Sequence, residues 1–517
     1  MDLTVGALTV AALNGRDSEP CLYDDGELRT YAQVRAQVSR LAQAMAERGI
    51  GRGTRVVVLA GNHPATVCFL AATFVAGVCG GALAAKTSRE DARNALVASE
   101  AEFLCVTPEF AATAAALASE IPRLRVLCLG RSDGVEDLLA ASEAYEPRPL
   151  RVSDVADQTP DDPVRVVFTG GTTGRSKVVR TSNRSNAWMT LIQLMEWDLP
   201  FAPRTYVTTP ISHSGKTMVL STWLRGGCLF LQDTSRFDAE GFADFVAEHE
   251  IEVTLLVPTM IYRILELPPA RDDRLACLDT VYYGGAAISP DRLGEAITRF
   301  GPRFAQFYGQ AEAPLTVCVL RKEDHVPGRL DSCGRPVPWV EVQLHDDEGR
   351  EVPAGEPGEL VVRGPLLMDG YVGAPEENAR ALAGGWLHTG DIARRGAGGF
   401  LTIVDRKKDM IITGGFNVYA REVEDVLARH PAVVEAAVYG IPDPGWGEQV
   451  RAVVTTTAPV TEDELRAHVR TAKGAVHVPK EIWTLGELPL TPVGKVDKKA
   501  LRDLPASAAR LPGGDRV

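Results

Sequence analysis

One stretch of small, hydroxyl and basic residues, FTGGTTGRSKVVR at 168–180, has the composition of a phosphate-binding loop. Its glycines let backbone N–H groups approach a phosphate, its hydroxyls can donate hydrogen bonds to phosphate oxygens, and Lys177 adds a compact charge. It is not a Walker A loop, because GxxxxGK[ST] does not align with it. Taken alone, it is equally compatible with a flexible loop. As a nucleotide triphosphate site, it would use Thr169, Gly170, Gly171, Thr172, Thr173, Gly174 and Lys177.

The elements around this stretch follow an α/β pattern. Short apolar runs that predict strands alternate with helical patterns such as ARNALVASE at 92–100. The predicted strands cover 55–60, 103–107, 125–130, 164–169, 253–258 and 279–285. We therefore expect two layered α/β subunits before residue 330. The glycine-rich stretch follows the strand at 164–169, and ligands gather at strand ends in such layers.

The second part of the chain has a different texture. Residues 335–404 alternate short strands with turns, which predicts a β-rich segment. After residue 405 the pattern is helix, strand, strand, helix, which is typical of a compact α+β unit. The charged run DRKKD at 405–409 is a candidate linker or a solvated turn. We expect a large α/β domain at 1–404 and a small α+β domain at 410–517.

Composition disfavours several classes of protein. The 517 residues carry 55 Lys+Arg against 68 Asp+Glu, a net charge of -13, which disfavours nucleic acid or an anionic membrane as a partner. Nine scattered cysteines without CxxC spacing indicate reduced thiols in a cytoplasmic protein without structural zinc. The N-terminus lacks the basic region of a secretory signal. The uncharged run 64–85 approaches membrane-spanning length, but its glycines favour a helix from Pro64 to Gly77 and a strand near Leu83.

Six stretches resemble, in order, the motifs of the adenylate-forming superfamily, which includes acyl-CoA synthetases, peptide-synthetase adenylation domains and luciferases. TGGTTGRSK resembles its phosphate loop, and YYGGAAIS (282–289) with QFYGQAEAP (306–314) its adenine and catalytic region. WLHTGDIA (386–393) resembles the ribose-binding segment. DRKKDMIITGGFNVYAREVE (405–424) resembles the hinge region, and TPVGKVDKKAL (491–501) the terminal lysine motif. The resemblance runs from about residue 25 to residue 502, and it implies ATP, Mg²⁺ and coenzyme A as ligands.

The resemblance also implies roles for single residues. Tyr308 is expected to stack on adenine, and Asp391 to accept the ribose hydroxyls, which suits the acceptor-only chemistry of a carboxylate. Arg406 is expected to reach the ribose or the phosphates. Glu312 is expected to hold Mg²⁺, with Thr172 as a second ligand. The adenine pocket is completed by Gln306, Gly284, Gly285 and Gly309.

Lys495 is implied to be the main catalyst, because a fixed cation lowers the barrier when a carboxylate attacks an anionic phosphate. Lys177, Glu312 and His213 are the other expected catalytic residues. Lys408 occupies the position of the hinge, around which the small domain turns after the acyl-adenylate has formed. The turn is expected to replace Lys495 by the face that carries Gly414 and Gly415. One departure is Ala311, where members of the superfamily commonly have Thr.

The sequence leaves two candidates for the thiol that accepts the acyl group. PDPGWGE at 442–448 resembles the acyl-CoA synthetase pattern, so that Trp446 would flank coenzyme A and Lys480 would meet its phosphates. The run VHVPK at 476–480 carries fewer cations than CoA-using relatives often show. The phosphopantetheine of an acyl carrier protein is therefore the alternative acceptor.

The acid pocket is expected near ISHSGKTMVL at 211–220, with His213, Lys216, Tyr283 and Gly309 as substrate-contacting residues. This segment lacks the Asp with which amino-acid-activating relatives bind an ammonium group, which disfavours an amino acid. Met218, Trp223 and Trp188 supply apolar bulk, which suits a medium-sized or bulky apolar acid, whether fatty, aryl or alicyclic. Lys216 would meet a second polar group of the acid or face solvent. A non-catalytic nucleotide- or acyl-binding protein remains the alternative from another class. We expect the protein to be a monomer or a homodimer.

Overall fold

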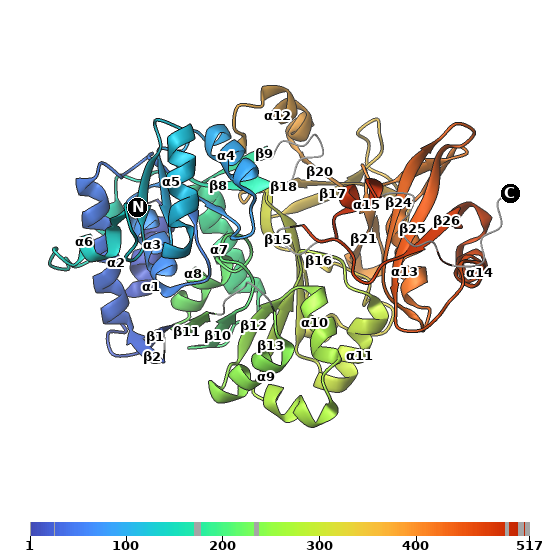
Figure 1. Cartoon of the computed structure of the whole chain (residues 1–517), viewed down its shortest axis with the longest axis horizontal. Helices are drawn as coiled ribbons and strands as arrows, with labels where there is room; N and C mark the ends of the chain where they lie inside the picture. Colours follow the sequence, from blue (N-terminus) through green and yellow to red (C-terminus); the bar gives the residue numbers. More distant parts are fainter. Residues whose placement is uncertain are drawn as a thin grey trace.

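The computed structural model describes residues 2–24, 26–169, 177–231, 237–491, 496–504 and residue 511. Within these ranges the strands form four sheets. The N-terminal elements lie at one end of the long axis and the C-terminal elements at the other (Figure 1). The predicted α/β class, with a small α+β unit at the C-terminal end, is confirmed.

An eight-stranded sheet in the order β19-β9-β8-β4-β3-β5-β6-β7 forms the first layer. The strands from β3 to β8 pair in parallel, whereas β9 and β19 pair antiparallel at one edge. Helices join the parallel strands, which explains the alternating sequence pattern. The strands are β3 (Arg55–Leu59), β4 (Cys79–Leu83), β5 (Phe103–Val106), β6 (Arg125–Cys128), β7 (Glu136–Asp137), β8 (Pro163–Thr169), β9 (Lys177–Ser182) and β19 (Gly370–Tyr371). The helices are α3 (Pro64–Val75), α4 (Arg89–Ala98), α5 (Ala111–Glu120) and α6 (Leu138–Ser142).

A nine-stranded sheet in the order β16-β15-β14-β13-β12-β10-β11-β1-β2 forms the second layer. The N-terminal hairpin of β1 (Pro20–Asp24) and β2 (Glu27–Thr30) joins this sheet through β11, a pairing that the sequence pattern did not predict. The other strands are β10 (Arg204–Val207), β11 (Cys228–Leu231), β12 (Val253–Leu256), β13 (Thr280–Tyr283), β14 (Phe304–Gln310), β15 (Ala313–Leu320) and β16 (Arg335–Pro336). Its helices are α8 (Thr217–Leu224), α9 (Ala239–Glu248), α10 (Pro258–Leu265) and α11 (Pro290–Phe300).

Helices fill the space between the two layers. α1 (Val5–Leu13) contacts both α3 and α8, while α2 (Tyr31–Glu47) contacts α3, and α7 (Asn183–Glu196) contacts α8. Trp223 and Tyr31 are fully buried there, and the Tyr31 hydroxyl donates a hydrogen bond to the Gly227 carbonyl at 2.8 Å. One apolar core therefore joins the helices to both sheets.

The run at 64–85 forms a helix and a strand, as expected. α3 begins at Pro64, and Gly77, with φ of 66°, follows its end before β4 begins at Cys79. No helix in the described residues combines the length and apolarity needed to cross a membrane. All nine cysteines are unpaired, and the described ranges contain no cluster of three side chains suited to hold a metal ion.

Two smaller sheets follow. The first has the order β17-β18-β20-β21 and contains β17 (Glu341–His345), β18 (Pro357–Arg363), β20 (Leu387–Arg395) and β21 (Leu401–Arg406), with α12 (Pro375–Ala381) before β20. The second has its own apolar core. It contains β22 (Ile411–Thr413), β23 (Phe416–Val418), β24 (Val433–Asp443), β25 (Gly447–Thr456) and β26 (Glu481–Thr484), with α13 (Ala420–Ala428), α14 (Glu462–Lys473) and α15 (Lys498–Arg502).

Candidate functional site

Tyr308, Asp391 and Arg406, which lie far apart in the sequence, are in direct contact. The Tyr308 hydroxyl, on β14, donates a hydrogen bond to Asp391 Oδ2 at 2.5 Å, and Arg406 Nε lies 2.6 Å from Asp391 Oδ1. β20 and β21 pair Asp391 directly with Arg406, which explains the ion pair. Asp391 is 2% exposed. Burial and then Asp391 raise the pKa of Tyr308 well above its ordinary value, so its hydroxyl stays a donor. The three residues predicted to bind a nucleoside thus form one group.

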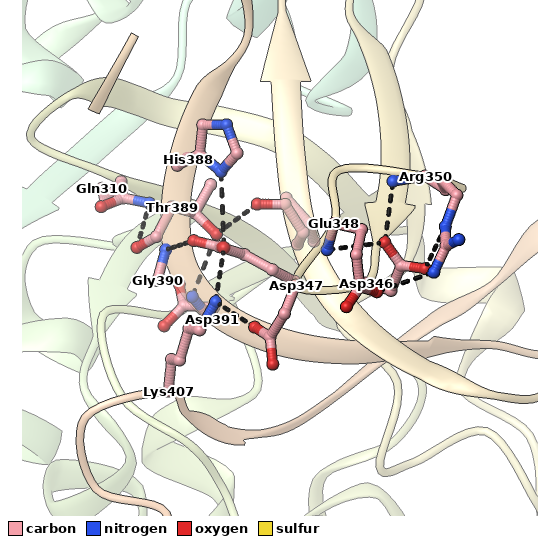
Figure 2. Close-up of polar contacts among 12 residues, drawn as sticks. Gln310, Asp346, Asp347, Glu348, Arg350, His388, Thr389, Gly390, Asp391 and Lys407 are labelled. Atoms are coloured by element: carbon pink, nitrogen blue, oxygen red, sulfur yellow. Dashed lines mark hydrogen bonds and ion pairs between the residues drawn. The ribbon is translucent and has the colours of Figure 1, made fainter. Parts of the chain in front are cut away.

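A polar network fixes the turn that carries Asp391 (Figure 2). The Gly390 N–H donates a hydrogen bond to Glu359 Oε1 at 3.1 Å, and Lys407 Nζ lies 3.2 Å from Glu359 Oε2 and 2.8 Å from Asp347 Oδ1. The Lys407 N–H also donates to the Gly390 carbonyl. Asp347 and then Glu359 raise the pKa of Lys407, although burial opposes them. The backbone next to Arg406 is therefore held against the β17-β18 sheet.

Glu312 and Lys177 are connected through Tyr371, a residue that the sequence analysis missed. The Tyr371 hydroxyl donates to Glu312 Oε1 at 2.9 Å, and Lys177 Nζ lies 4.7 Å from the centre of the Tyr371 ring. β19 brings Tyr371 beside β9, where it pairs with Val179. The sequence GY at 370–371 gives no signal for this role. An oxygen ligand and a cation thus face the same aromatic ring, next to the end of the predicted phosphate loop.

The predicted adenine pocket lies at the carboxyl ends of β13 and β14. The Tyr283 hydroxyl donates to Gln306 Oε1 at 3.4 Å and lies 3.0 Å from His325 Nε2. Gly284 is buried so closely that a Cβ would lie 2.7 Å from the Phe307 carbonyl oxygen. Gly285 has φ of 77°, is exposed, and leaves open space where a Cβ would stand. This exposed backbone suits a flat ligand beside Tyr308.

Gly309 lies against the chain rather than in open space. A Cβ at Gly309 would stand 2.6 Å from the Leu315 carbonyl carbon, so glycine is required for the turn from β14 to β15. Gln310, the residue after Gly309, connects this turn to β20, because its Nε2 donates to the Thr389 carbonyl at 3.4 Å (Figure 2). The contact ties the adenine side to the ribose side.

The segment predicted to contact the acid lies between β10 and α8. Ser212 Oγ and His213 Nδ1 are 2.9 Å apart, and Lys216 Nζ donates to the Ser212 carbonyl at 2.9 Å. Lys216 is half-buried at the N-terminal end of α8 and lines a cavity. Of the two alternatives for Lys216, this position agrees better with contact to a polar group than with full exposure to solvent. His213 and Lys216 are thus linked through one serine.

The predicted coenzyme residues meet in the C-terminal unit. The Trp446 ring covers the turn at Gly414, whose N–H donates to the Trp446 carbonyl at 2.8 Å, and Lys480 Nζ lies 5.2 Å from the ring centre. A Cβ at Gly414 would lie 2.5 Å from the ring. Trp446 is 52% exposed, and Gly415, which follows Gly414, has φ of 80°. An exposed aromatic face beside a cation is a surface on which a nucleotide base can stack.

Some of the predicted residues lie outside the described ranges. These are Gly170, Gly171, Thr172, Thr173, Gly174 and Lys495. Thr169 and Lys177 flank the phosphate stretch, and the Thr169 hydroxyl donates to the Lys177 carbonyl at 3.4 Å. Lys408 is exposed. The roles of all these residues stay predictions.

The donor set fits a nucleotide with a hard cation. Asp391 offers carboxylate oxygens suited to hydroxyl donors, and Glu312 keeps Oε2 for a cation while Oε1 accepts from Tyr371. One or two carboxylates together with phosphate oxygens are the usual protein share of a Mg²⁺ site. Asp391 and Glu312 are therefore the described residues that could hold the ribose and the metal of a Mg²⁺–nucleotide complex.

Comparison with known proteins agrees with this geometry. The model of the AMP-binding enzyme family matches residues 10–372, and that of the AMP-binding enzyme C-terminal domain matches residues 422–495. The chain is 41% identical to the medium/long-chain-fatty-acid–CoA ligase FadD8 of Mycobacterium tuberculosis, covering 96% of this chain and 89% of the relative. It is 36% identical to a feruloyl-CoA synthase of an Amycolatopsis species, covering 92% and 94%.

A solved structure of another protein has the same fold as this chain. The amide bond synthetase McbA of Marinactinospora thermotolerans superposes with a TM-score of 0.88 at 32% identity, covering 96% of this chain and 99% of the other. The family models and the identities over most of the chain show that this protein belongs to the AMP-binding enzymes of the adenylate-forming superfamily.

Proposed function

We propose that this chain is an AMP-forming acid–thiol ligase that joins a carboxylic acid to coenzyme A in two steps. In the first step, a carboxylate oxygen of the acid attacks the α-phosphorus of ATP, and pyrophosphate leaves with its electron pair. In the second step, the sulfur of the thiol attacks the acyl carbon, AMP leaves with the original carboxylate oxygen, and the thiol proton is released. The products are acyl-CoA, AMP and pyrophosphate.

The observation that carries this proposal is the contact of Tyr308, Asp391 and Arg406. It places an aromatic ring, a buried carboxylate and a cation together. ATP binding would exchange the hydrogen bond and ion pair of Asp391 for bonds from the ribose hydroxyls. Arg406 would then turn toward ribose or phosphate oxygens, to which its planar guanidinium is well matched. Both relatives named above at 41% and 36% identity carry names of CoA-forming enzymes.

Electrostatics supplies most of the catalysis expected in the first step, because two anions must approach each other. Lys177 and Lys495 would stabilise the charge that develops on the phosphates. Bound Mg²⁺ would neutralise phosphate oxygens and orient the pyrophosphate leaving group. Glu312, oriented by Tyr371 at 2.9 Å, would hold this ion. His213, fixed by Ser212, would lie beside the reacting carboxylate.

The second step would need the small domain to turn. We infer a boundary at 405–409, with the large domain at 1–404 and the small one at 410–517. Lys407 forms ion pairs with Asp347 and Glu359 of the large domain, whereas the exposed Lys408 forms no ion pair with any described residue. A pivot at Lys408 would therefore leave Arg406 at the nucleotide and move the surface of Gly414 and Trp446.

The acceptor has a second candidate, a carrier-protein phosphopantetheine. Around Trp446, Lys480 supplies the cation, while Asp443 Oδ1 accepts from the Trp446 N–H at 2.9 Å and Glu448 Oε2 accepts from the Ile412 N–H. One lysine beside two carboxylates is a modest site for the phosphates of free coenzyme A. A carrier protein does not require such a site.

Acid-dependent exchange of labelled pyrophosphate into ATP tests the first step. We expect exchange only when a suitable acid and Mg²⁺ are present, and acyl-CoA with AMP by mass spectrometry after CoA is added. Failure of every acid in a panel of fatty, aryl and alicyclic acids would refute the adenylation proposal. Exchange without thioester formation on CoA, but with loading of a phosphopantetheinylated carrier protein, would assign the alternative acceptor.

A further inference from the structure

An apolar cavity of about 40 Å³ lies between the two α/β layers. Its walls come from α1, α3 and α8 on one side and from β4 and β8 on the other. Phe74, Leu70 and Trp223 are among its apolar lining residues. Since about 10–15 Å³ of such space holds one water molecule, the cavity has room for a small polar group of a ligand or for a few waters.

Two cations project from these apolar walls. Arg165 on β8 is 8% exposed, and among the described residues its guanidinium has no ion pair and no hydrogen bond. Lys216 lines the same cavity, where one of its three donors bonds to the Ser212 carbonyl. The walls contain no aspartate or glutamate. A buried cation without a counter-ion is unfavourable, so Arg165, with the half-buried Lys216 on the same apolar cavity, needs an explanation.

The pKa shifts of Arg165 and Lys216 agree with two cations that lie in an apolar environment and repel each other. Burial lowers the pKa of Arg165 to about 10, so it stays protonated at neutral pH. Burial and then the charge of Arg165 lower the pKa of Lys216 well below its ordinary value. An anion placed between them would raise both values and remove the repulsion.

The strand opposite Arg165 leaves room for such an anion. β4 and β8 pair Gly80 with Arg165. A Cβ at Gly80 would stand 3.7 Å from Thr73 Oγ1 and 3.9 Å from the Val164 carbonyl oxygen, which are ordinary contacts. Close packing therefore does not require a glycine at this position. The absence of a side chain at Gly80 leaves space in the cavity above β4.

The cavity adjoins the proposed acid site through two segments. On the α8 side, Ser212 contacts both His213 and Lys216. On the β8 side, Arg165 precedes Thr169, where the phosphate stretch begins, by four residues. At about 3.3 Å per residue this is a separation of about 13 Å along the strand. This separation matches the length of a medium-sized acid with one end at the nucleotide and the other in the cavity.

The geometry points to Arg165 and Lys216 as the binding site for a second acidic group at the far end of the acid. The preferred substrates would then be α,ω-dicarboxylic acids, or acids with a comparable anionic end, joined by an apolar middle. Planar guanidinium and carboxylate groups match each other, and a charge-assisted hydrogen bond is stronger than a neutral one. This inference rests on the proposed acid-activating function and specifies its substrate class.

The test compares chain-matched acids in the pyrophosphate-exchange assay with the full-length protein. Each aliphatic dicarboxylic acid is paired with the monocarboxylic acid of the same carbon number, over a series of lengths. We expect kcat/KM at the best length to favour the diacid by about tenfold to a hundredfold, the usual effect of a hydrogen bond to a charged group. Equal or better use of the monoacids at every length, by a protein that does catalyse exchange, would refute this inference alone.

Substitutions separate this binding role from a structural one. Arg165→Met and Lys216→Met should each reverse the preference, lowering kcat/KM for the diacid while that for the monoacid is maintained or rises. Arg180→Met, the same substitution at an exposed arginine on the neighbouring β9, is the matched control and should leave the ratio unchanged. An unchanged ratio in a folded Arg165 or Lys216 variant would overturn the assignment.

The remaining outcomes are also decisive. If Arg165→Met does not fold, the ratio of kcat/KM for the diacid to that for the monoacid can still be measured. Lys216→Met and the unmodified protein, each assayed with the paired acids, then provide the test. Absence of exchange with every acid, mono or di, would contradict the proposed function itself and the inference with it. Exchange restricted to monoacids would leave the proposed function in place and remove only the second-carboxylate site.

Discussion

Asp405→Asn should stabilise the protein, and more strongly at high pH. Asp405 is the first residue of the proposed boundary at 405–409, next to Arg406, and is only 6% exposed. Its carboxylate accepts hydrogen bonds from the N–H groups of Arg406 at 2.7 Å and Arg421 at 3.4 Å. Burial raises the pKa of Asp405 from 3.8 to about 6, although Lys498 opposes this shift. The ionised form is therefore less stable in the folded protein than in the unfolded chain.

The magnitude follows from linkage. Because the folded pKa is the higher one, the folded state binds more protons between about pH 4 and pH 6, and the stability falls as pH rises through this window. A shift of about two units corresponds to about 3 kcal/mol above pH 7, and to about half of that at pH 5. Asparagine has nearly the same shape and no charge, so Asp405→Asn should gain up to these amounts.

Urea unfolding of the wild type and Asp405→Asn between pH 5 and pH 8 measures this difference. The gain in the free energy of unfolding should grow by about 1.4 kcal/mol across the range, the equivalent of one pH unit of differential proton binding. Asp331→Asn removes an exposed carboxylate of the large domain and serves as the control, with a flat difference. A gain that does not change with pH, or a loss at pH 8, would show that burial does not destabilise the Asp405 carboxylate.

Three further substitutions test the proposed roles. Lys495→Ala should lower adenylation by about 10²- to 10³-fold and spare thiol transfer from a preformed acyl-adenylate; loss of both steps in single-turnover assays would refute the assignment of Lys495 to the first step alone. Trp446→Ala removes the ring beside Lys480 and should raise KM for coenzyme A roughly tenfold, with pyrophosphate exchange unchanged; equal loss of exchange would count against this role. Tyr371→Phe keeps the ring but deletes the hydrogen bond to Glu312, so half-maximal exchange should require several-fold more Mg²⁺; an unchanged Mg²⁺ titration would separate Tyr371 from metal binding.

Much of the fold could be predicted because local apolar runs determine strands. The runs at 55–60 and 164–169 became β3 and β8 with ends shifted by one residue. The pairing of β1 with β11 could not be predicted in this way, since Leu22 and Leu229 meet across two hundred residues and periodicity carries no information on such partners.

The site, like the fold, contains residues that the sequence predicted and residues that it could not predict. Tyr308, Asp391 and Arg406 stand in motifs that resemble a known family, and the structure brings them into contact. Tyr371 lies in a dipeptide without a pattern, and its role depends on β19 joining the edge of a sheet formed mainly by residues before 183. Arg165 was visible only as a charge within an apolar strand, and its lack of a counter-ion is a property of the packed cavity.

The central claim is that the acid is activated by forming a bond to the α-phosphorus of ATP. An acid labelled with oxygen-18 in both carboxylate oxygens tests this most directly, in a complete reaction with ATP, Mg²⁺ and coenzyme A. We predict that one labelled oxygen appears in AMP, because the thiol displaces AMP together with the attacking oxygen. Label in inorganic phosphate, with ADP as the nucleotide product, would contradict the account.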